Sequence, residues 1–180
     1  CRMELEQLKF PIGRFKPQHS YAAEELKSNI QLISALPSKL LNLTSGWDED
    51  KLNTPYRPDG WTIRQLIHHI ADSHMNASIR IRLTLTEDNP VIKPYKQDLW
   101  AELPDAKTAS IEMSLQLIRY IHLRLVVLLN SLGSQELSRT YHHPETNRDY
   151  RIDEVIALYA WHSEHHYQQA FQLARRNNWN

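Results

Sequence analysis

The chain has 180 residues, of which 41% are hydrophobic and 23% charged, the composition of an ordinary globular protein. Lysine plus arginine and aspartate plus glutamate number 21 each, so no net charge draws the protein to nucleic acid or to an anionic membrane surface. No apolar run reaches the roughly 18 residues of a membrane span. We therefore expect one domain over residues 1–180 that binds neither nucleic acid nor a membrane.

Cys1 is the one cysteine, and a single thiol cannot form an internal disulfide. This suits a reducing compartment, and no signal peptide opens the sequence, so we expect a cytoplasmic protein. Met3 is a candidate natural start, which would place Cys1 and Arg2 upstream of it. The four glycines favour long helices over tight turns.

The first segment, residues 1–19, is expected to be an extended arm laid over the body, because Pro11 and Gly13 oppose a helix. Ser20 is a suitable N-cap for a first long helix. Pro37 lies inside that helix and is expected to kink or divide it, since proline removes an intrahelical hydrogen bond.

Three further long helices are expected after the first one. Thr62 and Gln65 form a capping box where the first of them begins. The long connections between helices, over residues 86–105 and 134–151, are of the kind that carries function or crosses a bundle. Four long helices joined in this way predict an all-α fold, a four-helix bundle. The three helices span about residues 62–85, 107–132 and 152–176. In the middle one the expected inward face is Ile111, Leu115, Ile118, Ile121, Leu125, Leu128 and Leu132.

Two histidines interrupt the apolar stripe of the last helix. His162 and His166 lie one turn apart, separated by about 6 Å of helix rise, so their rings can point at a single ion. An unpaired polar group in a core costs free energy, so the pair indicates either a metal site or hydrogen-bond partners inside the bundle. The stripe is Ile152, Val155, Tyr159, His162, His166, Gln169 and Leu173.

A third ligand would have to come from another helix, and the helix over residues 62–85 offers three histidines. Relative to its apolar face, His68 points away, His69 lies at the edge and His74 lies within the stripe. Periodicity alone slightly favours His74 as the ligand. A structural role, with the ring hydrogen-bonded in the core, is the alternative for any core-facing histidine.

Several familiar catalytic patterns are absent from the sequence. It has no Glu-x-x-His pair for a di-iron bundle, no His-Glu-x-x-His, no Gly-x-Ser-x-Gly elbow and no glycine-rich phosphate loop. The lone cysteine is terminal, so a protein nucleophile lacks support.

Four fragments of the chain, taken together, resemble the DinB-like superfamily, and within it the YfiT-type metal-dependent hydrolases. They occur in the order found in that family and span nearly the whole chain from about residue 9. The fragments are residues 10–13 (FPIG), 54–57 (TPYR), 61–76 (WTIRQLIHHIADSHMN) and 161–166 (WHSEHH).

The resemblance implies a homodimeric four-helix bundle that binds one divalent metal per chain, Zn²⁺ or Ni²⁺. It assigns the ligands to His69, His162 and His166, which replaces the preference for His74 that periodicity gives. The chain departs from the family at Gln169, where relatives have a further histidine, and at Asp59, where a glycine is more usual.

Three neutral imidazoles leave a coordination position open, as in catalytic zinc sites. Such an ion activates water for hydrolysis, or binds and deprotonates a thiol. Asp72 lies one turn beyond His69 and is a tentative residue for orienting that ring or accepting a proton; the alternative is an exposed carboxylate.

Three functions are therefore considered for the chain. The first is a metal-dependent hydrolase acting on a small-molecule substrate, as the resemblance implies. The second is a metal-dependent thiol S-transferase of the bacillithiol type, in which a low-molecular-weight thiol is a substrate. The third is a non-catalytic, metal-binding dimeric bundle. A ligand position that opens into a cleft would favour an enzyme.

Overall fold

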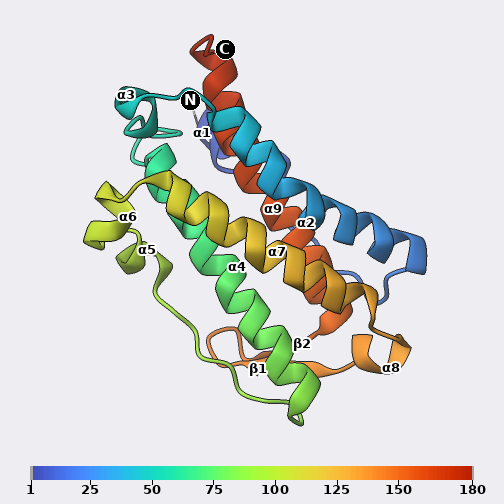
Figure 1. Ribbon diagram of the computed structural model, residues 1–180. Coiled ribbons are helices and arrows are strands. Elements are labelled where there is room, and N and C mark those ends of the chain that lie inside the picture. The colour runs from blue at the N-terminus through green and yellow to red at the C-terminus, as the bar shows by residue number, and fades with distance from the viewer. Residues whose placement is uncertain (1, 180) are drawn as a thin grey trace.

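The structure is a computed structural model that describes residues 2–179, and it is built on four long helices (Figure 1). The expected four-helix bundle is confirmed. Cys1, which we expect to form no internal disulfide, lies outside the described residues. Among those residues, no helix combines the length and the apolarity that a membrane span requires. The long helices are α2 (Ala23–Thr44), α4 (Ile63–Thr86), α7 (Ile111–Asn130) and α9 (Ile152–Arg176).

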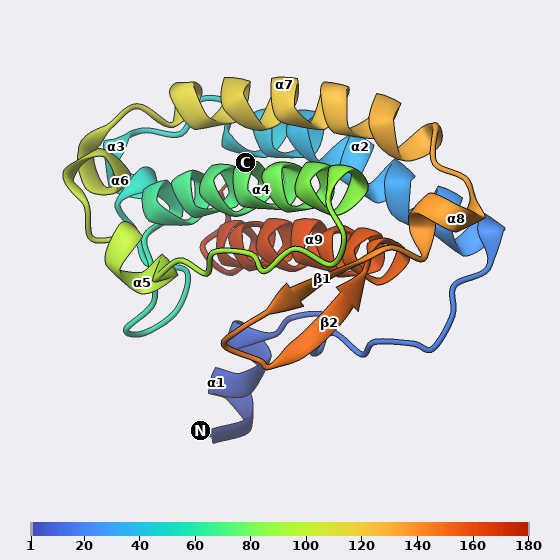
Figure 2. The same cartoon turned by 90° about the horizontal axis from the view of Figure 1, so that it is seen from below.

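The order of the helices around the bundle is not the order of the chain. Helix α2 packs against α7 and α9, and α4 packs against the same two helices. Figure 2 shows α7 and α9 on opposite sides of the bundle, with α2 and α4 between them. In Figure 1, α4 and α7 run in one direction, and α2 and α9 run in the other. Helices α4 and α9, which carry the candidate ligands, are therefore antiparallel neighbours.

The segments before and between the long helices contain short elements that the sequence did not predict. A hairpin of two antiparallel strands, with Thr140 opposite Arg151 and His143 opposite Arg148, stands beside the start of α9 (Figure 2). The fold is otherwise helical, so the hairpin is a small addition to the bundle. The short elements are α1 (Arg2–Lys9), α3 (Glu49–Leu52), α5 (Gln97–Trp100), α6 (Pro104–Thr108), α8 (Ser134–Leu137), β1 (Thr140–His143) and β2 (Arg148–Arg151).

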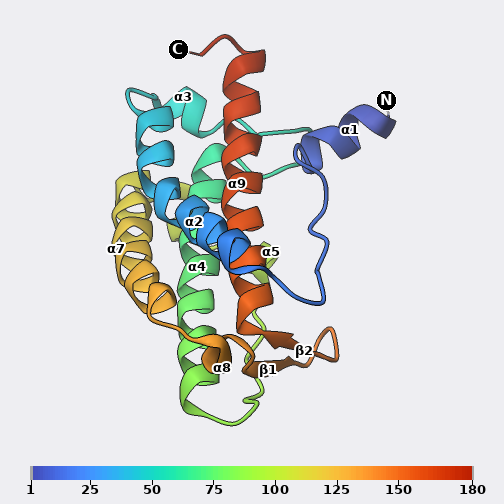
Figure 3. The ribbon, with the colours of Figure 1, turned by 90° about the vertical axis from the view of Figure 1, so that its right-hand side faces the viewer.

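The N-terminal segment begins with a helix, so the extended arm expected over residues 1–19 is wrong for its first half. Helix α1 ends at Lys9, just before Pro11 and Gly13. Those two residues therefore oppose helix only in the chain that follows α1. After α1 the chain is non-helical as far as Ala22, and the indole Nε1–H of Trp161 donates to the carbonyl of Gly13 at 3.1 Å. Figure 3 shows α1 standing beside α9.

Helix starts were predicted correctly for α4 but not for α2. Thr62 and Gln65 form the expected capping box, in which the Gln65 amide N–H donates to Thr62 Oγ1 and the Thr62 N–H donates to Gln65 Oε1. Helix α2 begins at Ala23, with Ala22 rather than Ser20 in the N-cap position and no side chain as a cap. A capping residue type is a weak signal where it lacks the second half of the box.

Pro37 does not divide α2, which is one helix that bends along its length (Figure 3). Proline at this position leaves the carbonyl of Ile33, four residues earlier, without its helical donor. His122 Nδ1–H of α7 donates to that carbonyl at 2.6 Å. A side chain from a neighbouring helix thus replaces the missing backbone donor.

The buried face of α7 differs from the expected one by about one position. His122 and Leu129 are 1% and 3% exposed, whereas Ile121, Leu128 and Leu132 are only half-buried. The apolar periodicity alone indicated a face that contains Ile121, Leu128 and Leu132, and it gave no signal that His122 is buried. The residues buried on α7 are Ser114, Leu115, Ile118, His122, Leu125 and Leu129.

The core consists of two apolar clusters separated by a layer of histidines. One cluster includes Leu40, Ile67 and Leu173, and the other includes Ile33, Ile81 and Ile156. The histidines occupy the helix positions between the clusters on α4, α7 and α9: His74, His122, His162, His165 and His166. The polar layer therefore lies midway along the bundle, with apolar packing on both sides.

Candidate metal centre

Three histidines from two helices converge at the edge of this layer. One nitrogen from each of His69, His162 and His166 lies within 4.8 Å of the others. His69 comes from α4, and the other two come from consecutive turns of α9, with 3.1 Å between their Nε2 atoms. The structure thus brings together the three residues that the family resemblance implied as ligands, and their role as ligands stays a prediction. His74, which periodicity slightly favoured, is not part of it.

His166 is oriented by Gln169. The Nδ1–H of His166 donates to Gln169 Oε1 at 2.7 Å, and Gln169 Nε2–H donates to the carbonyl of Lys9 at 2.8 Å. The second bond identifies which end of the amide faces His166, because a carbonyl can only accept. Nε2 of His166 is therefore the unprotonated nitrogen. Gln169, where the chain departs from the family pattern, thus orients the ring of a candidate ligand.

His162 is oriented by His74. Nδ1 of His162 and Nε2 of His74 are 3.0 Å apart, on the side of the His162 ring away from His166. His74 is 1% exposed and lies in the stripe where periodicity placed it. Its position is that of a partner to a ligand rather than of a ligand. The hydroxyl Oγ of Ser73 is 3.4 Å from His162 Nε2, which is long for a hydrogen bond.

His69 has no comparable partner, and the orienting role expected of Asp72 is not seen. Within residues 5–179, His69 forms no hydrogen bond, and its ring packs at 4.5 Å from that of Trp61. Asp72 is half-buried, and burial, followed by the charge of Asp105, raises its pKa to about 6. Its carboxylate makes no hydrogen bond to a histidine of the cluster in the described chain.

Burial keeps the three imidazoles neutral. It lowers the pKa of His69 to about 4, and it holds the pKa values of His162 and His166 well below the ordinary value, with a further contribution from the neighbouring rings. Neutral imidazole is the form that binds metal. At neutral pH the cluster is therefore ready to act as a ligand set.

The donor set fits a divalent ion. The Nε2 atoms of His162 and His166 lie 3.1 Å apart, and the one on His166 carries no proton, so its lone pair faces the ring of His162. A cation held between the two nitrogens would accept that lone pair. Two nitrogens on a tetrahedral zinc ion, at about 2.1 Å each, would be about 3.4 Å apart, which is close to the observed spacing.

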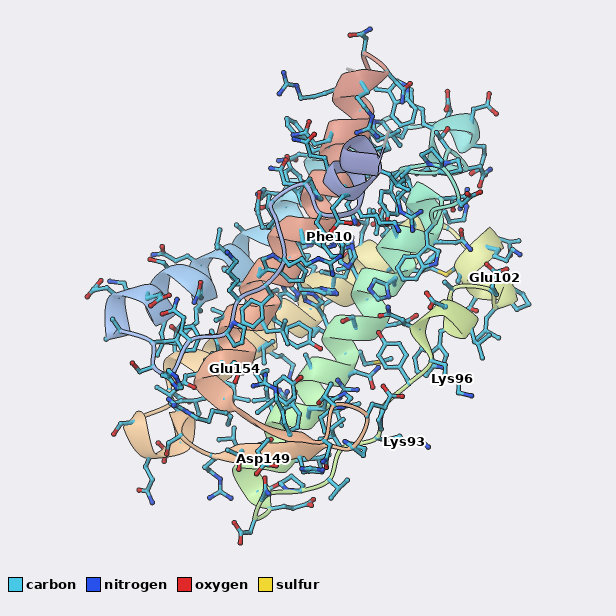
Figure 4. All side chains as sticks on the ribbon, turned by 180° about the vertical axis from the view of Figure 1, so that it is seen from behind. Phe10, Lys93, Lys96, Glu102, Asp149 and Glu154 are labelled. Carbon is cyan, nitrogen blue, oxygen red and sulfur yellow. The ribbon has the colours of Figure 1, made fainter. Side chains whose placement is uncertain are left out.

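A cavity of about 540 Å³ opens over the cluster. The rings of Phe10 and Trp161 lie 5.6 Å and 4.5 Å from that of His165, so an aromatic wall adjoins the ligands. Figure 4 shows Phe10 lying over α9. The cavity provides the open access that favours an enzyme. Its charged lining residues are Lys9, Arg14, Arg57, Asp59 and Asp98.

Four residues of the cavity lining lie outside the fragments and departures singled out in the sequence: Lys9, Arg14, Gln97 and Asp98. Arg14, Gln97 and Asp98 come from segments treated as an arm and a connection. The signal that could have found the first is the FPIG fragment at residues 10–13, which precedes it directly. Asp59 has a φ of 55°, the left-handed region that favours glycine, which suits the glycine that the family resemblance implied at this position. Aspartate tolerates this conformation better than most residues.

The fold and the cluster define a class of protein, the helical bundles with a three-histidine cluster that could hold a metal ion and opens to a cavity. The chain belongs to the DinB superfamily, whose family profile matches residues 32–170.

Similar proteins cover almost the whole chain. A relative from Bacillus subtilis (strain 168) is 42% identical over 96% of this chain and 97% of its own length, and one from Bacillus cereus (strain 03BB102) is 44% identical over 97% and 100%. Both carry the name "putative metal-dependent hydrolase", the first with the designation YfiT.

A solved structure of YfiT from Bacillus subtilis superimposes with a TM-score of 0.94 at 41% identity, and covers 97% of this chain and 99% of that one. It is described as "a probable metal-dependent hydrolase with an unusual four-helix bundle topology".

Proposed function

We propose that this protein is a metal-dependent hydrolase that holds one divalent ion through His69, His162 and His166. The observation that carries the proposal is the convergence of one nitrogen from each of these three rings within 4.8 Å, beneath an open cavity. Imidazole donors suit zinc and nickel alike, so we propose Zn²⁺ or Ni²⁺ as the ion. The names of the relatives support the same reaction class.

Three neutral ligands leave the positive charge of the ion uncompensated, which favours chemistry over a purely structural role. When bound, the ion supplies Lewis-acid activation of water for attack on the substrate. The chain supplies the surroundings: Trp61 and Trp161 offer apolar contact, and Arg14 and Arg57 offer donors to polar groups of a small-molecule substrate. No serine or cysteine lines the cavity among the described residues, which favours water over a protein nucleophile.

The ligand set is tested by elemental analysis of single variants. His69→Ala, His162→Ala and His166→Ala should each lose the bound metal, while His68→Ala should keep it. His68 is a suitable control because it lies beside His69 on α4 and bonds to Ser114 Oγ at 2.7 Å, away from the cluster. Full retention of metal by any of the three ligand variants would remove that residue from the site.

The reaction is tested with metal-loaded protein against a panel of esters and amides, without added thiol. Hydrolysis that rises as the pH approaches neutrality and disappears in His162→Ala is the expected result. Turnover that strictly requires a low-molecular-weight thiol and an electrophile would assign the protein as an S-transferase. If fully loaded protein shows neither activity, the non-catalytic metal-binding bundle would be the function that remains.

A further inference from the structure

A line of hydrogen bonds runs from the metal centre across the whole bundle. His162 on α9 contacts His74 on α4 at 3.0 Å between Nδ1 and Nε2. His74 contacts His122 on α7 at 2.6 Å between Nδ1 and Nε2. His122 Nδ1 in turn lies 2.6 Å from the carbonyl oxygen of Ile33 on α2. Three side chains thus connect all four long helices.

The far end of this line determines the direction of every bond in it. The carbonyl of Ile33 can only accept, so His122 Nδ1 carries the hydrogen. His122 is 1% exposed and has no carboxylate partner among the side chains described, residues 5–179. An uncompensated charge there would be costly, so its ring is neutral and Nε2 accepts. The hydrogen between the next two rings therefore belongs to His74 Nδ1.

The same reasoning carries through to the ligand. His74 is 1% exposed and neutral, so with its hydrogen on Nδ1 its Nε2 accepts from His162 Nδ1–H. His162 is left with its lone pair on Nε2, the atom that faces His166. A line that ran the other way would put a hydrogen on that atom and oppose a cation.

The anchor of the line is a consequence of Pro37. In an uninterrupted helix the Ile33 carbonyl would accept from the amide N–H of residue 37, and proline has none. The freed carbonyl is buried with Ile33, which is 1% exposed, and it points at α7 closely enough to bond His122. A backbone acceptor is a better anchor than a side chain because it cannot rotate or exchange donor for acceptor.

We propose that His74 and His122 are positioning residues for the metal: anchored on the Ile33 carbonyl, they hold His162 in the Nδ1–H tautomer with Nε2 directed at the ligand cluster. This inference rests on the proposed function only in taking His162 as a ligand. A positioning role differs from that of a core histidine that is only hydrogen-bonded in the interior. Substitution of a purely structural histidine would not change metal affinity, whereas substitution of His74 should.

The tautomer is measured directly by two-bond ¹H–¹⁵N NMR of the metal-free wild-type protein. His162, assigned by its loss in His162→Gln, should show a protonated Nδ1 and an unprotonated Nε2, and His74 and His122 should show the same pattern. A protonated Nε2 on His162 would overturn the proposal. This experiment needs no folded variant of the line and no activity.

Metal affinity is measured by chelator competition with Zn²⁺ and Co²⁺. His74→Leu removes the acceptor and should weaken binding by about 10- to 100-fold, the usual effect of losing a partner to a ligand. His74→Gln retains an acceptor oxygen near the position of Nε2 and should stay within about threefold of the wild type. His68→Leu, a buried histidine of the same helix outside the line, is the matched control and should bind as the wild type does.

Equal affinity in His74→Leu and the wild type would overturn the positioning role. An equal loss in His74→Leu and His68→Leu would also overturn it, because any buried histidine would then have the same effect. If His74→Leu does not fold, two measurements still decide: the metal affinity of His74→Gln relative to the wild type, and the tautomer of His162 in the wild-type protein. Failure of hydrolysis in fully loaded wild-type protein would contradict only the proposed function, since neither readout here measures turnover.

Discussion

At the scale of single residues, the three-histidine cluster depends on the side chains that orient its rings. His162 and His166 each have a partner on the far nitrogen, His74 and Gln169, whereas His69 is held by packing against Trp61. The family motif in the sequence indicated the three histidines of the cluster, but not these partners. A side chain that accepts from a ligand has no fixed spacing from it, so no local pattern identifies it.

Substitution of Gln169 tests whether the partner of His166 affects metal affinity. Gln169→Leu removes the acceptor for His166 Nδ1–H, frees the ring to take the other tautomer and should lower metal affinity by about tenfold or more. Gln169→Glu retains an acceptor oxygen and should bind metal at least nearly as tightly as the wild type. Gln172→Leu, on the next turn of α9, serves as a control in the same chelator competition. Unchanged affinity in Gln169→Leu would show that helix geometry alone orients His166.

At the scale of elements, prediction succeeded where two signals coincided. The start of α4 combined a capping box with an apolar stripe, and α9 was predicted with its observed bounds, Ile152 to Arg176. Helix α1, the hairpin and the order of helices around the bundle were not predicted. A short helix and a four-residue strand carry too few apolar residues for a periodicity, and helix order depends on packing between segments distant in the sequence.

Pro37 gives a prediction for a whole helix. Pro37→Ala supplies an amide N–H to the Ile33 carbonyl, which has a second lone pair and can keep its bond to His122. Proline costs about 3 kcal/mol relative to alanine inside a helix, and its restriction of the unfolded chain offsets up to about 1 kcal/mol. We expect urea denaturation to show a free energy of unfolding higher by about 1–2 kcal/mol. Ser34→Ala, exposed on the same helix, should change it by less than about 0.5 kcal/mol. A lower stability of Pro37→Ala would mean that the bend itself is required for packing.

At the scale of the whole molecule, the apolar clusters on both sides of the histidine layer should allow the bundle to fold without a metal. Helix α4 contributes Ile67 to one cluster and Ile81 to the other, so each half of the bundle has its own packing. The homodimer implied by the family resemblance stays a prediction, and sedimentation equilibrium would check it.

Removal of the metal should therefore leave the helices intact. Circular dichroism of chelator-treated protein, and of His166→Ala, should retain the helical signal of the loaded wild type, unlike a zinc finger, which unfolds without its ion. The melting temperature should fall, because a ligand that binds only the folded state stabilises it. Collapse of the helical signal on chelation would make the metal structural and weaken the case for an enzyme.

The histidine layer should also make the free energy of unfolding of the metal-free protein depend on pH. Burial lowers the pKa of both His69 and His122 to about 4, while an unfolded histidine titrates near 6.5, so between these values the unfolded state binds more protons than the folded state. The free energy of unfolding should therefore be at its full value above pH 6.5 and should fall as the pH drops toward 4. Asp72, with a pKa raised to about 6, should make the free energy of unfolding rise as the pH falls. This effect comes from one half-buried carboxyl, whereas the opposite effect comes from several buried imidazoles.

Urea denaturation of metal-free protein at pH 7, 5.5 and 4.5 measures this dependence. Each unit by which a folded pKa is lowered is equivalent to about 1.4 kcal/mol, so the loss should be large enough to resolve. His122→Leu removes one of the titrating rings and should show a shallower decline over the same range. Metal-loaded wild type should resist acid to a lower pH, because protons must displace the ion before His69, His162 and His166 can titrate. Equal stability of the metal-free protein at pH 7 and pH 4.5 would show that water reaches the layer and that the rings are not held neutral by burial.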